Sequence, residues 1–434
     1  MPYTQSIRVG LPFVPRVKLV ALEDLLVSDI DGLEIGKLLK GQDCEVCPRE
    51  PAEFTLVSVL PGPTDQEIPA GLEPFLRRLY ITEPGNIELY RGGGGVILEM
   101  GKWRLELAGV RLSGAVMIRD LPVGRGFPWE FTENAMFHGE TEILPWKEGQ
   151  LRPVNIVSVE DYIASVVASE IGQAAPHEAQ KAQAVAARST LFSTYGSHHL
   201  LGPFGICSED HCQVYRGFGL ETPDSRLAAT ETSGLVLLYE GWVVDARFSK
   251  CCGGITEEFR GAWDGLDVPY LVSRPDGKYN LSLNSEEDVK NFINNPPPAF
   301  CSGSKNFRWE TAYRTDQISQ IIRAKTGQDI GAITEITPLA RAKSGRINRI
   351  RLIGQKRELV LGPELEIRRV LSETYLNSSC FYVMRNGDSF IIRGAGWGHG
   401  VGMCQEGAIA MARDGKGFSE ILEFYYPWTR TERV

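Results

Sequence analysis

The stretch that decides the fold is residues 154–217, VNIVSVEDYIASVVASEIGQAAPHEAQKAQAVAARSTLFSTYG followed by SHHLLGPFGICSEDHCQVYRG. Ser158 is a favourable N-cap residue, and Asp161 three positions later completes a variant of the capping box. A first helix is therefore predicted to begin directly after Ser158. A second helix and a loop that contains Cys and His follow within the same stretch.

The first helix carries a carboxylate on its apolar face. Ile163, Val166 and Val167 recur with the spacing of one helical face, and Glu170 is the next position on that face. Because burial disfavours a charged carboxylate, the pKa of Glu170 should rise, which suits a general acid. The alternative is that Glu170 ends the helix and turns to solvent just before Gly172.

The second helix should occupy residues 176–195, because proline fits a first helical position and Gly196 is a typical stop. Its middle, residues 179–187, is mostly alanine, which allows close packing. Lys181 and Arg188 are seven positions apart and share a face. Together with the nearby Gln180 and Gln183, these side chains could line a cleft for a polar or anionic substrate. Alternatively, they could form the solvated face of an amphipathic helix.

The loop after the second helix contains residues typical of a zinc site. Cys207, His211 and Cys212 form a compact Cys-x3-His-Cys group, and His198 or His199 would complete a tetrahedral Cys2His2 site. A turn or the start of a helix is required at His211 and Cys212, because adjacent side chains on a strand point to opposite faces. The spacing is not that of a standard zinc finger. A disulfide between the two cysteines, or free thiols with incidental histidines, remain as alternatives.

This stretch and later segments resemble the stage II sporulation protein D family, which includes the modifier proteins of autolysins, the amidase enhancers. The matching segments are VEDYIASVVASEI (159–171), EAQKAQAVAARS (178–189), HCQVYRG (211–217), T-x-G (232–234), FSKCCGG (248–254) and GWGHGVGMCQEGA (396–408). The likeness extends from about Phe137 to the C-terminus. Ala168 stands where proline is common and Cys404 where serine is common, and neither change affects an expected catalytic group.

The resemblance implies a peptidoglycan lytic transglycosylase, which cleaves the glycan strand between MurNAc and GlcNAc and forms 1,6-anhydroMurNAc. The catalytic glutamate of the family maps to Glu170, as a single acid and base. Some members bind zinc in the segment that maps to Cys207, His211 and Cys212. With a histidine as fourth ligand the zinc would be structural, because no coordination position stays open.

Substrate contacts are expected from two parts of the chain. The candidate residues are Lys181, Arg188, Gln213 and Tyr215, together with His399 and Gln405. The last two lie in a glycine-rich stretch, residues 393–407, where the backbone can approach a ligand closely. The alternative is a packing loop that docks the helix expected to follow it.

Composition limits the other possibilities. The 434 residues carry a net charge of −9, which argues against nucleic-acid binding, and 43% are hydrophobic. We expect an α+β protein, mostly strands, with the two-helix catalytic segment packed on them. The predicted domains are an N-terminal β-rich region, residues 1–129, and a catalytic core, residues 130–434. In the first, LEPFLRRLY suggests a short helix, and the glycine run after Arg91 suggests a loop.

Location and partners follow from the resemblance. No apolar run reaches the roughly 18 residues of a membrane-spanning helix. The first residues lack the features of a signal peptide, so a location in the cell envelope requires an export signal outside this sequence. The expected partners are glycan strands, with an amidase as a further candidate. A non-catalytic amidase enhancer that binds an autolysin or glycan, and a metal-dependent hydrolase, are the alternative functions.

The cysteine count leaves disulfide pairing open. Nine cysteines are an odd number, so at least one is unpaired or a ligand. Cys251 and Cys252 are adjacent, and adjacent cysteines rarely bond to each other because the geometry is strained. Either could pair with Cys301, because spacing does not determine connectivity.

Overall fold

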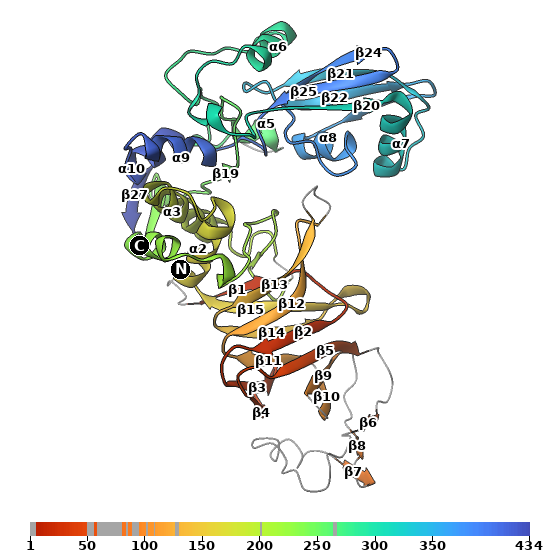
Figure 1. Ribbon diagram of the computed structural model, residues 1–434, viewed down its shortest axis with the longest axis vertical. Helices are drawn as coiled ribbons and strands as arrows, with labels where there is room; N and C mark the ends of the chain where they lie inside the picture. The colour runs from red at the N-terminus through yellow and green to blue at the C-terminus, as the bar shows by residue number, and fades with distance from the viewer. Residues whose placement is uncertain are drawn as a thin grey trace. The chain divides into compact units, whose positions relative to one another are not determined.

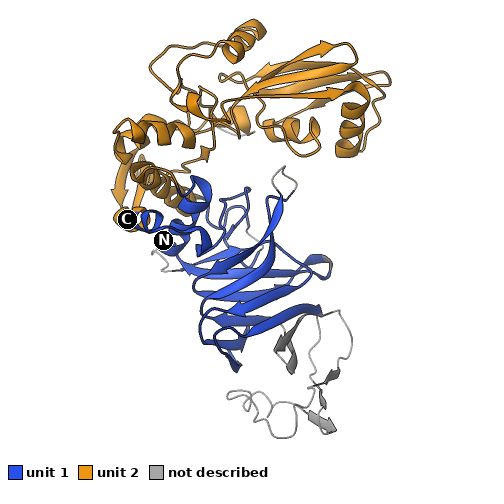
Figure 2. Ribbon diagram, viewed as in Figure 1, with its two compact units in different colours: residues 1–125, 129–173, 194–227 blue, residues 126–128, 174–193, 228–434 orange. Residues whose placement is uncertain are grey.

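The computed structural model describes residues 6–49, 56–58, 80–83, 86–88, 95–100, 103–107, 109–125, 130–199, 202–263 and 267–434 (Figure 1). The chain forms two compact units (Figure 2). Unit 1 comprises residues 1–125, 129–173 and 194–227, and unit 2 comprises residues 126–128, 174–193 and 228–434. Except for their last residues, the helix expected in LEPFLRRLY and the loop expected after Arg91 lie outside the described residues. The division into domains at residues 129 and 130 stays a prediction.

Unit 1 consists mainly of two sheets. The seven-stranded sheet has the order β16-β1-β15-β14-β11-β3-β4, with strands Ile206–Cys207, Ser6–Gly10, Leu151–Ser158, Glu140–Pro145, Val110–Ser113, Leu25–Asp29 and Glu34–Leu38. The six-stranded sheet has the order β10-β9-β5-β2-β12-β13, with strands Trp103–Leu107, Gly95–Met100, Asp43–Arg49, Val17–Ala21, Val116–Val123 and Phe131–Phe137. Neighbouring strands are antiparallel except β1 and β16, which run parallel. A small sheet, β6-β8-β7, has strands Leu56–Ser58, Asn86–Glu88 and Tyr80–Glu83.

Helix α2 (Val159–Glu170) follows β15 directly, as the sequence predicts. The Ser158 hydroxyl accepts a hydrogen bond from the backbone N–H of Asp161 at 3.2 Å, which confirms the N-cap. Residues 162–168 are all buried, so the apolar face of the helix is covered. The helix ends at Glu170, and the backbone turns at Gly172, where φ is +95°.

Helix α3 (His177–Thr194) confirms the second predicted helix to within one residue at each end. Every residue from 182 to 191 is buried. This fits the alanine-rich composition, because small side chains let neighbouring backbone approach closely. Residues 174–193, which carry nearly all of α3, belong to unit 2, whereas α2 belongs to unit 1.

Unit 2 contains several small sheets with helices between them. The sheets are β18-β17-β27 (Trp242–Val243, Leu235–Tyr239, Arg430–Arg433), β19-β26 (Phe248–Ser249, Met403–Cys404), β20-β25-β24 (Arg308–Arg314, Ser389–Ala395, Phe381–Asn386) and β21-β22-β23 (Ile333–Arg341, Ile347–Gly354, Glu358–Leu361). The helices beyond Leu227 are α5 (Phe259–Ala262), α6 (Glu286–Asn294), α7 (Thr315–Thr326), α8 (Glu364–Val370), α9 (Gln405–Arg413) and α10 (Phe418–Tyr425), and α4 (Pro223–Glu231) crosses from unit 1. The described residues also include three short 3-10 helices, η1 (Lys147–Gly149) and η2 (Phe218–Leu220) in unit 1 and η3 (Phe300–Gly303) in unit 2.

The expected α+β fold made mostly of strands is confirmed. Unit 2 has one hydrophobic cluster around α9, α10 and η3, and another between α7, α8 and the sheet β21-β22-β23. Within the part of the chain that the structure describes, no helix is both long enough and apolar enough to cross a membrane.

Candidate functional site

Glu170 is the last residue of α2, and its side chain is half-buried. Its Oε1 atom accepts a hydrogen bond from the backbone N–H of Val214 at 2.7 Å. The carboxylate therefore ends the helix without turning away from the protein, which combines parts of the two readings of the sequence. The loop that holds it lies directly after the Cys/His segment, because Val214 is two residues beyond Cys212.

The Cys/His segment folds back on itself through two backbone hydrogen bonds. Cys207 ends β16, the N–H of Cys212 donates to the carbonyl of Glu209 at 3.0 Å, and the N–H of Tyr215 donates to the carbonyl of Ser208 at 3.1 Å. The turn between them supplies the reversal that the adjacent residues His211 and Cys212 require. Their side chains consequently lie beside Cys207.

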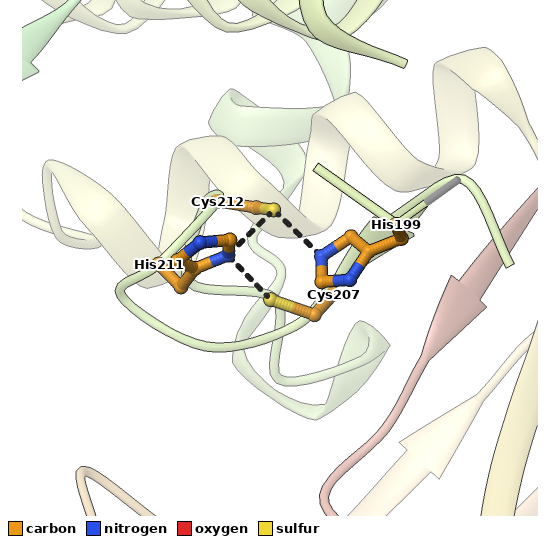
Figure 3. A group of neighbouring side chains, drawn as sticks. All are labelled: His199, Cys207, His211 and Cys212. Atoms are coloured by element: carbon orange, nitrogen blue, oxygen red, sulfur yellow. Dashed lines mark hydrogen bonds between the residues drawn. The ribbon is translucent and has the colours of Figure 1, made fainter. Parts of the chain in front are cut away.

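Four side chains meet at this turn, as Figure 3 shows. His199, Cys207, His211 and Cys212 each offer one ligand atom, and all four atoms lie within 4.8 Å of one another. The structure thus selects His199 as the fourth member of this group. His198 is exposed, and its Nδ1 atom is 3.9 Å from the Sγ atom of Cys212.

The separations of these atoms fit a tetrahedral zinc ion. Zinc–sulfur bonds of about 2.3 Å and zinc–nitrogen bonds of about 2.0–2.1 Å set sulfur–nitrogen separations of about 3.6 Å. From the Sγ atom of Cys212, the Nε2 atom of His199 is 3.3 Å away and the Nδ1 atom of His211 is 3.5 Å away. The Sγ atom of Cys207 is 3.9 Å from the same His211 nitrogen. The group could therefore hold zinc with only small movements.

The electrostatics of the cluster also suit a metal. Hydrogen bonding with Cys212 lowers the pKa of the Cys207 thiol to about 3, and His211 adds to this effect, although burial opposes it. The thiolate is the form that binds zinc. Together with burial, negative charge on Cys212, Cys207 and Glu170 raises the pKa of the Tyr162 hydroxyl well above its ordinary value.

Tyr162 is a residue that the sequence reasoning missed. It lies on α2, fully buried, and among the described residues its hydroxyl has no hydrogen-bond partner. The signal was present in the sequence, because Tyr162 and Glu170 are eight positions apart and therefore share a helical face.

Two of the residues expected to bind substrate are buried in unit 1. Gln213 is 1% exposed and Tyr215 is 4% exposed. The Tyr215 hydroxyl donates to the Oδ1 atom of Asn155 at 2.7 Å, and its ring lies 5.0 Å from that of Tyr162. Asn155 in turn donates to the carbonyl of His138 at 2.8 Å. The Tyr215 side chain is thus held in the interior by partners of its own.

Arg188 and Lys181 have different environments on α3, although they share a face. Arg188 is fully buried, and its guanidinium donates to the carbonyls of Leu235 at 3.1 Å and Ala229 at 3.3 Å. The Nζ atom of Lys181 donates to Glu178 at 2.8 Å and pairs with Glu231 at 3.4 Å, and the Lys181 side chain is 15% exposed. Burial therefore gives Arg188 a role in packing, whereas Lys181 stays at a surface.

His399 and Gln405 both belong to unit 2. The Nδ1 atom of His399 accepts the N–H of Val401 at 3.0 Å, and its ring lies 4.8 Å from that of Trp263. Burial, with the positive charge of neighbouring arginines, lowers the pKa of His399 to about 3, so the ring is neutral near pH 7. Gln405 is 2% exposed and donates to the Oε1 atom of Gln183 on α3 at 3.2 Å.

A cavity of about 430 Å³ lies in unit 2, close to Trp263. Its lining includes the basic side chains of Arg260, Arg341, Lys343 and Arg349, against one acidic side chain, Glu258. The volume falls within the range of small-molecule sites. Three of the basic groups are paired with carboxylates, however: Arg341 with Glu286, Lys343 with Glu258 at 2.7 Å, and Arg260 with Asp267 at 3.4 Å. The sequence did not reveal this cavity, because its lining comes from segments about eighty residues apart.

Comparisons with known proteins agree with the motifs. A family model described as "Stage II sporulation protein" matches residues 147–239, and a "Domain of unknown function (DUF8618)" matches residues 257–402. The chain is 30% identical over 304 residues to an uncharacterized protein of Brachyspira hyodysenteriae, with 68% of this chain and 72% of that protein covered.

Two relatives from Bacillus subtilis carry descriptive names. The chain is 29% identical over 293 residues to the stage II sporulation protein D of that organism, with 64% of this chain and 75% of that protein covered. It is 29% identical over 296 residues to the amidase enhancer, with 62% of this chain covered but only 40% of that protein. The chain belongs to the stage II sporulation protein D family.

Proposed function

We propose that the protein acts on the cell wall as a lytic transglycosylase, cleaving peptidoglycan glycan strands between MurNAc and GlcNAc. The observation that carries the proposal is the fixed position of Glu170, a half-buried carboxylate at the end of α2 whose Oε1 atom accepts the N–H of Val214. A proton donor must hold one direction toward the bond that it cleaves. Membership of a family named for sporulation, and likeness to an amidase enhancer, support a role at the cell wall.

In this mechanism Glu170 acts twice. Its carboxyl group first gives a proton to the glycosidic oxygen, and the bond from that oxygen to C1 of muramic acid breaks. The C6 hydroxyl of the same sugar then attacks C1, and the Glu170 carboxylate takes the hydroxyl proton. The products are a shortened strand and a 1,6-anhydro ring, with no water consumed. One carboxyl group suffices because the nucleophile is tethered within the substrate, which favours attack by proximity.

His199, Cys207, His211 and Cys212 would hold a zinc ion in this account. The ion would cross-link the turn and supply no open coordination position to substrate, because four protein ligands complete the tetrahedron. The turn leads directly to Val214, whose N–H contacts Glu170. The protein's own residues therefore connect the metal centre to the position of the catalytic carboxyl group.

Most of the residues expected to contact substrate are buried, so few candidates remain. Lys181, whose side chain is 15% exposed and pairs with Glu178 and Glu231, remains a candidate for the lactyl or peptide carboxylates of the wall. Arg188 and Tyr215 are assigned to packing instead, because their polar atoms bond to partners inside the protein. We place the protein in the cell envelope.

A second function is favoured by one comparison. The likeness to the amidase enhancer suggests a non-catalytic protein that binds an autolysin or glycan. Purified glycan strands incubated with this protein alone separate the two functions. Release of soluble fragments without any amidase would establish an enzyme. Binding without release, unchanged in Glu170→Gln, would support the enhancer and overturn the transglycosylase.

A further inference from the structure

A second group of metal-type ligands lies in the core of unit 2. Cys252, Asp276, Cys301 and Cys404 each offer one ligand atom, and these four atoms lie within 4.8 Å of one another. All four residues are at most 1% exposed. They come from four separate segments, so the fold, and not a local motif, brings them together. The group is distinct from the Cys/His cluster, which belongs to unit 1.

We propose that these four residues form a second, structural zinc site. Zinc–sulfur bonds of about 2.3 Å and zinc–oxygen bonds of about 2.0–2.2 Å set edges of about 3.8 Å between sulfurs and about 3.6 Å between sulfur and oxygen. The Sγ atoms of Cys252 and Cys301 are 3.7 Å apart. The four atoms thus need to move little to become the corners of one tetrahedron.

The groups around the four ligands are arranged as an outer shell. The Sγ atom of Cys404 accepts the backbone N–H of Cys252 at 3.1 Å and that of Gly407 at 3.4 Å. Asp276 accepts the N–H of Cys301 at 3.1 Å on Oδ2 and the hydroxyl of Tyr425 at 2.7 Å on Oδ1. Donors directed at ligand atoms orient them and moderate their charge, as metal sites require.

Burial also favours a cation at this place. Asp276 is fully buried, and a buried carboxylate is costly without a compensating positive charge. Arginines close to the group bond elsewhere: Arg346 donates to the carbonyl of Cys252 at 3.1 Å, Arg308 donates to the carbonyl of Gly253 at 2.9 Å, and Arg274 donates to the carbonyl of Phe424. A divalent ion would bind all four ligand atoms at once.

A disulfide is the competing explanation. A bond between Cys252 and Cys301 would need their sulfurs at about 2.05 Å instead of the observed 3.7 Å. The Cys251 thiol also contacts the thiols of Cys301 and Cys404, so a second disulfide could form there. Disulfides would still give no reason for Asp276 to converge on this place. Zinc accounts for the complete group.

The site would brace the segment that carries Gln405. Cys404 is the N-cap of α9, and Gln405 is the first residue of that helix. Gln405 donates to Gln183 on α3. A metal that joins Cys404 to η3 and to Asp276 would therefore hold the start of α9 against α3 within unit 2.

The test is the zinc content of the full-length protein, purified under reducing conditions and measured by native mass spectrometry and by elemental analysis. We expect Cys404→Ser and Asp276→Asn each to bind one zinc ion fewer per chain than the unmutated protein. Cys380→Ser is the matched control, because Cys380 is buried in unit 2 but lies outside the group. It should keep the full zinc content.

Cys212→Ser distinguishes the Cys/His cluster of unit 1 from the proposed site in unit 2. This variant should lose the zinc ion of unit 1 and retain the one bound in unit 2. The unmutated protein provides the measurement that does not depend on a variant folding. Purified in a separate preparation without reductant and analysed under denaturing, non-reducing conditions, it should have Cys252, Cys301 and Cys404 as free thiols. Unmutated protein whose zinc is entirely lost in Cys212→Ser would overturn the second site. A Cys252–Cys301 disulfide found by peptide mapping, or protein without zinc, would overturn it equally.

Discussion

The Oε1 atom of Glu170 lies 2.7 Å from the backbone nitrogen of Val214 and accepts its hydrogen bond. This contact joins the end of α2 to the loop that follows the Cys/His cluster, because Val214 is two residues after Cys212. A backbone donor cannot rotate away as a side chain can, so the direction of the carboxyl group depends on the path of the loop. Any change that loosens the loop should therefore reduce the activity that depends on Glu170.

Glu170→Gln should lower the rate of glycan cleavage by at least about 100-fold, because general acid–base catalysis contributes roughly 10²–10⁴-fold. The substitution keeps the side-chain volume and an oxygen that can accept the N–H of Val214, so the fold should persist. Glu160→Gln, in the first turn of the same helix, is the matched control and should cleave normally. Cleavage by Glu170→Gln above about one hundredth of the original rate would exclude this residue as the acid.

His199→Ala should release the zinc ion of unit 1, whereas His198→Ala should retain it. The reason is that the ligand atom of His199 lies within the group of four, while His198 is exposed to solvent. Elemental analysis of both variants, each in a Cys404→Ser background, counts only the unit 1 ion. Equal zinc content in the two variants would show that the fourth ligand is not His199.

Arg188→Met should lower the free energy of unfolding by about 3 kcal/mol, because buried carbonyl oxygens lose their donor. Lys181→Met on the same helix is the control and should cost less than about 1 kcal/mol, as partly exposed ion pairs usually do. Urea unfolding measures both. If Arg188→Met instead leaves stability unchanged and weakens glycan binding, Arg188 is a substrate contact after all.

His399 should make the protein less stable as the pH falls. Its pKa is about 3 in the folded protein and 6.5 ordinarily, so between these values the unfolded chain binds a proton that the folded protein does not. Stability from this residue is complete above pH 6.5 and decreases toward pH 3, by at most about 1.4 kcal/mol per pH unit. The difference in unfolding free energy between the original protein and His399→Gln should shrink between pH 7 and pH 5. Parallel pH profiles would contradict this.

Local signals were sufficient for the two helices. Ser158 and Asp161 form an N-cap that depends only on neighbouring residues. The alanine-rich middle of α3 predicted a buried helix, because small side chains allow close packing. The Cys/His cluster was partly predictable, because three of its members lie within six residues. The choice between His198 and His199 was not, because it depends on how the preceding turn directs each side chain.

Features that depend on distant segments could not be predicted. Cys252 and Cys404 are separated by about 150 residues, and no spacing rule connects them. Arg188 shares a helical face with Lys181, yet only tertiary structure decides that its guanidinium bonds to the carbonyls of Ala229 and Leu235. A helical pattern shows which residues share a face but not what covers it.

The measurement that tests the central claim most directly is the mass of the products formed from purified glycan strands in H₂¹⁸O. A single carboxyl group that directs attack by the substrate's own C6 hydroxyl consumes no water. The new muramic acid end should therefore carry a 1,6-anhydro ring and no ¹⁸O, and Glu170→Gln should not form it. An end that carries one ¹⁸O atom would show hydrolysis, which requires a second carboxylate or another water-activating group and contradicts the proposed mechanism.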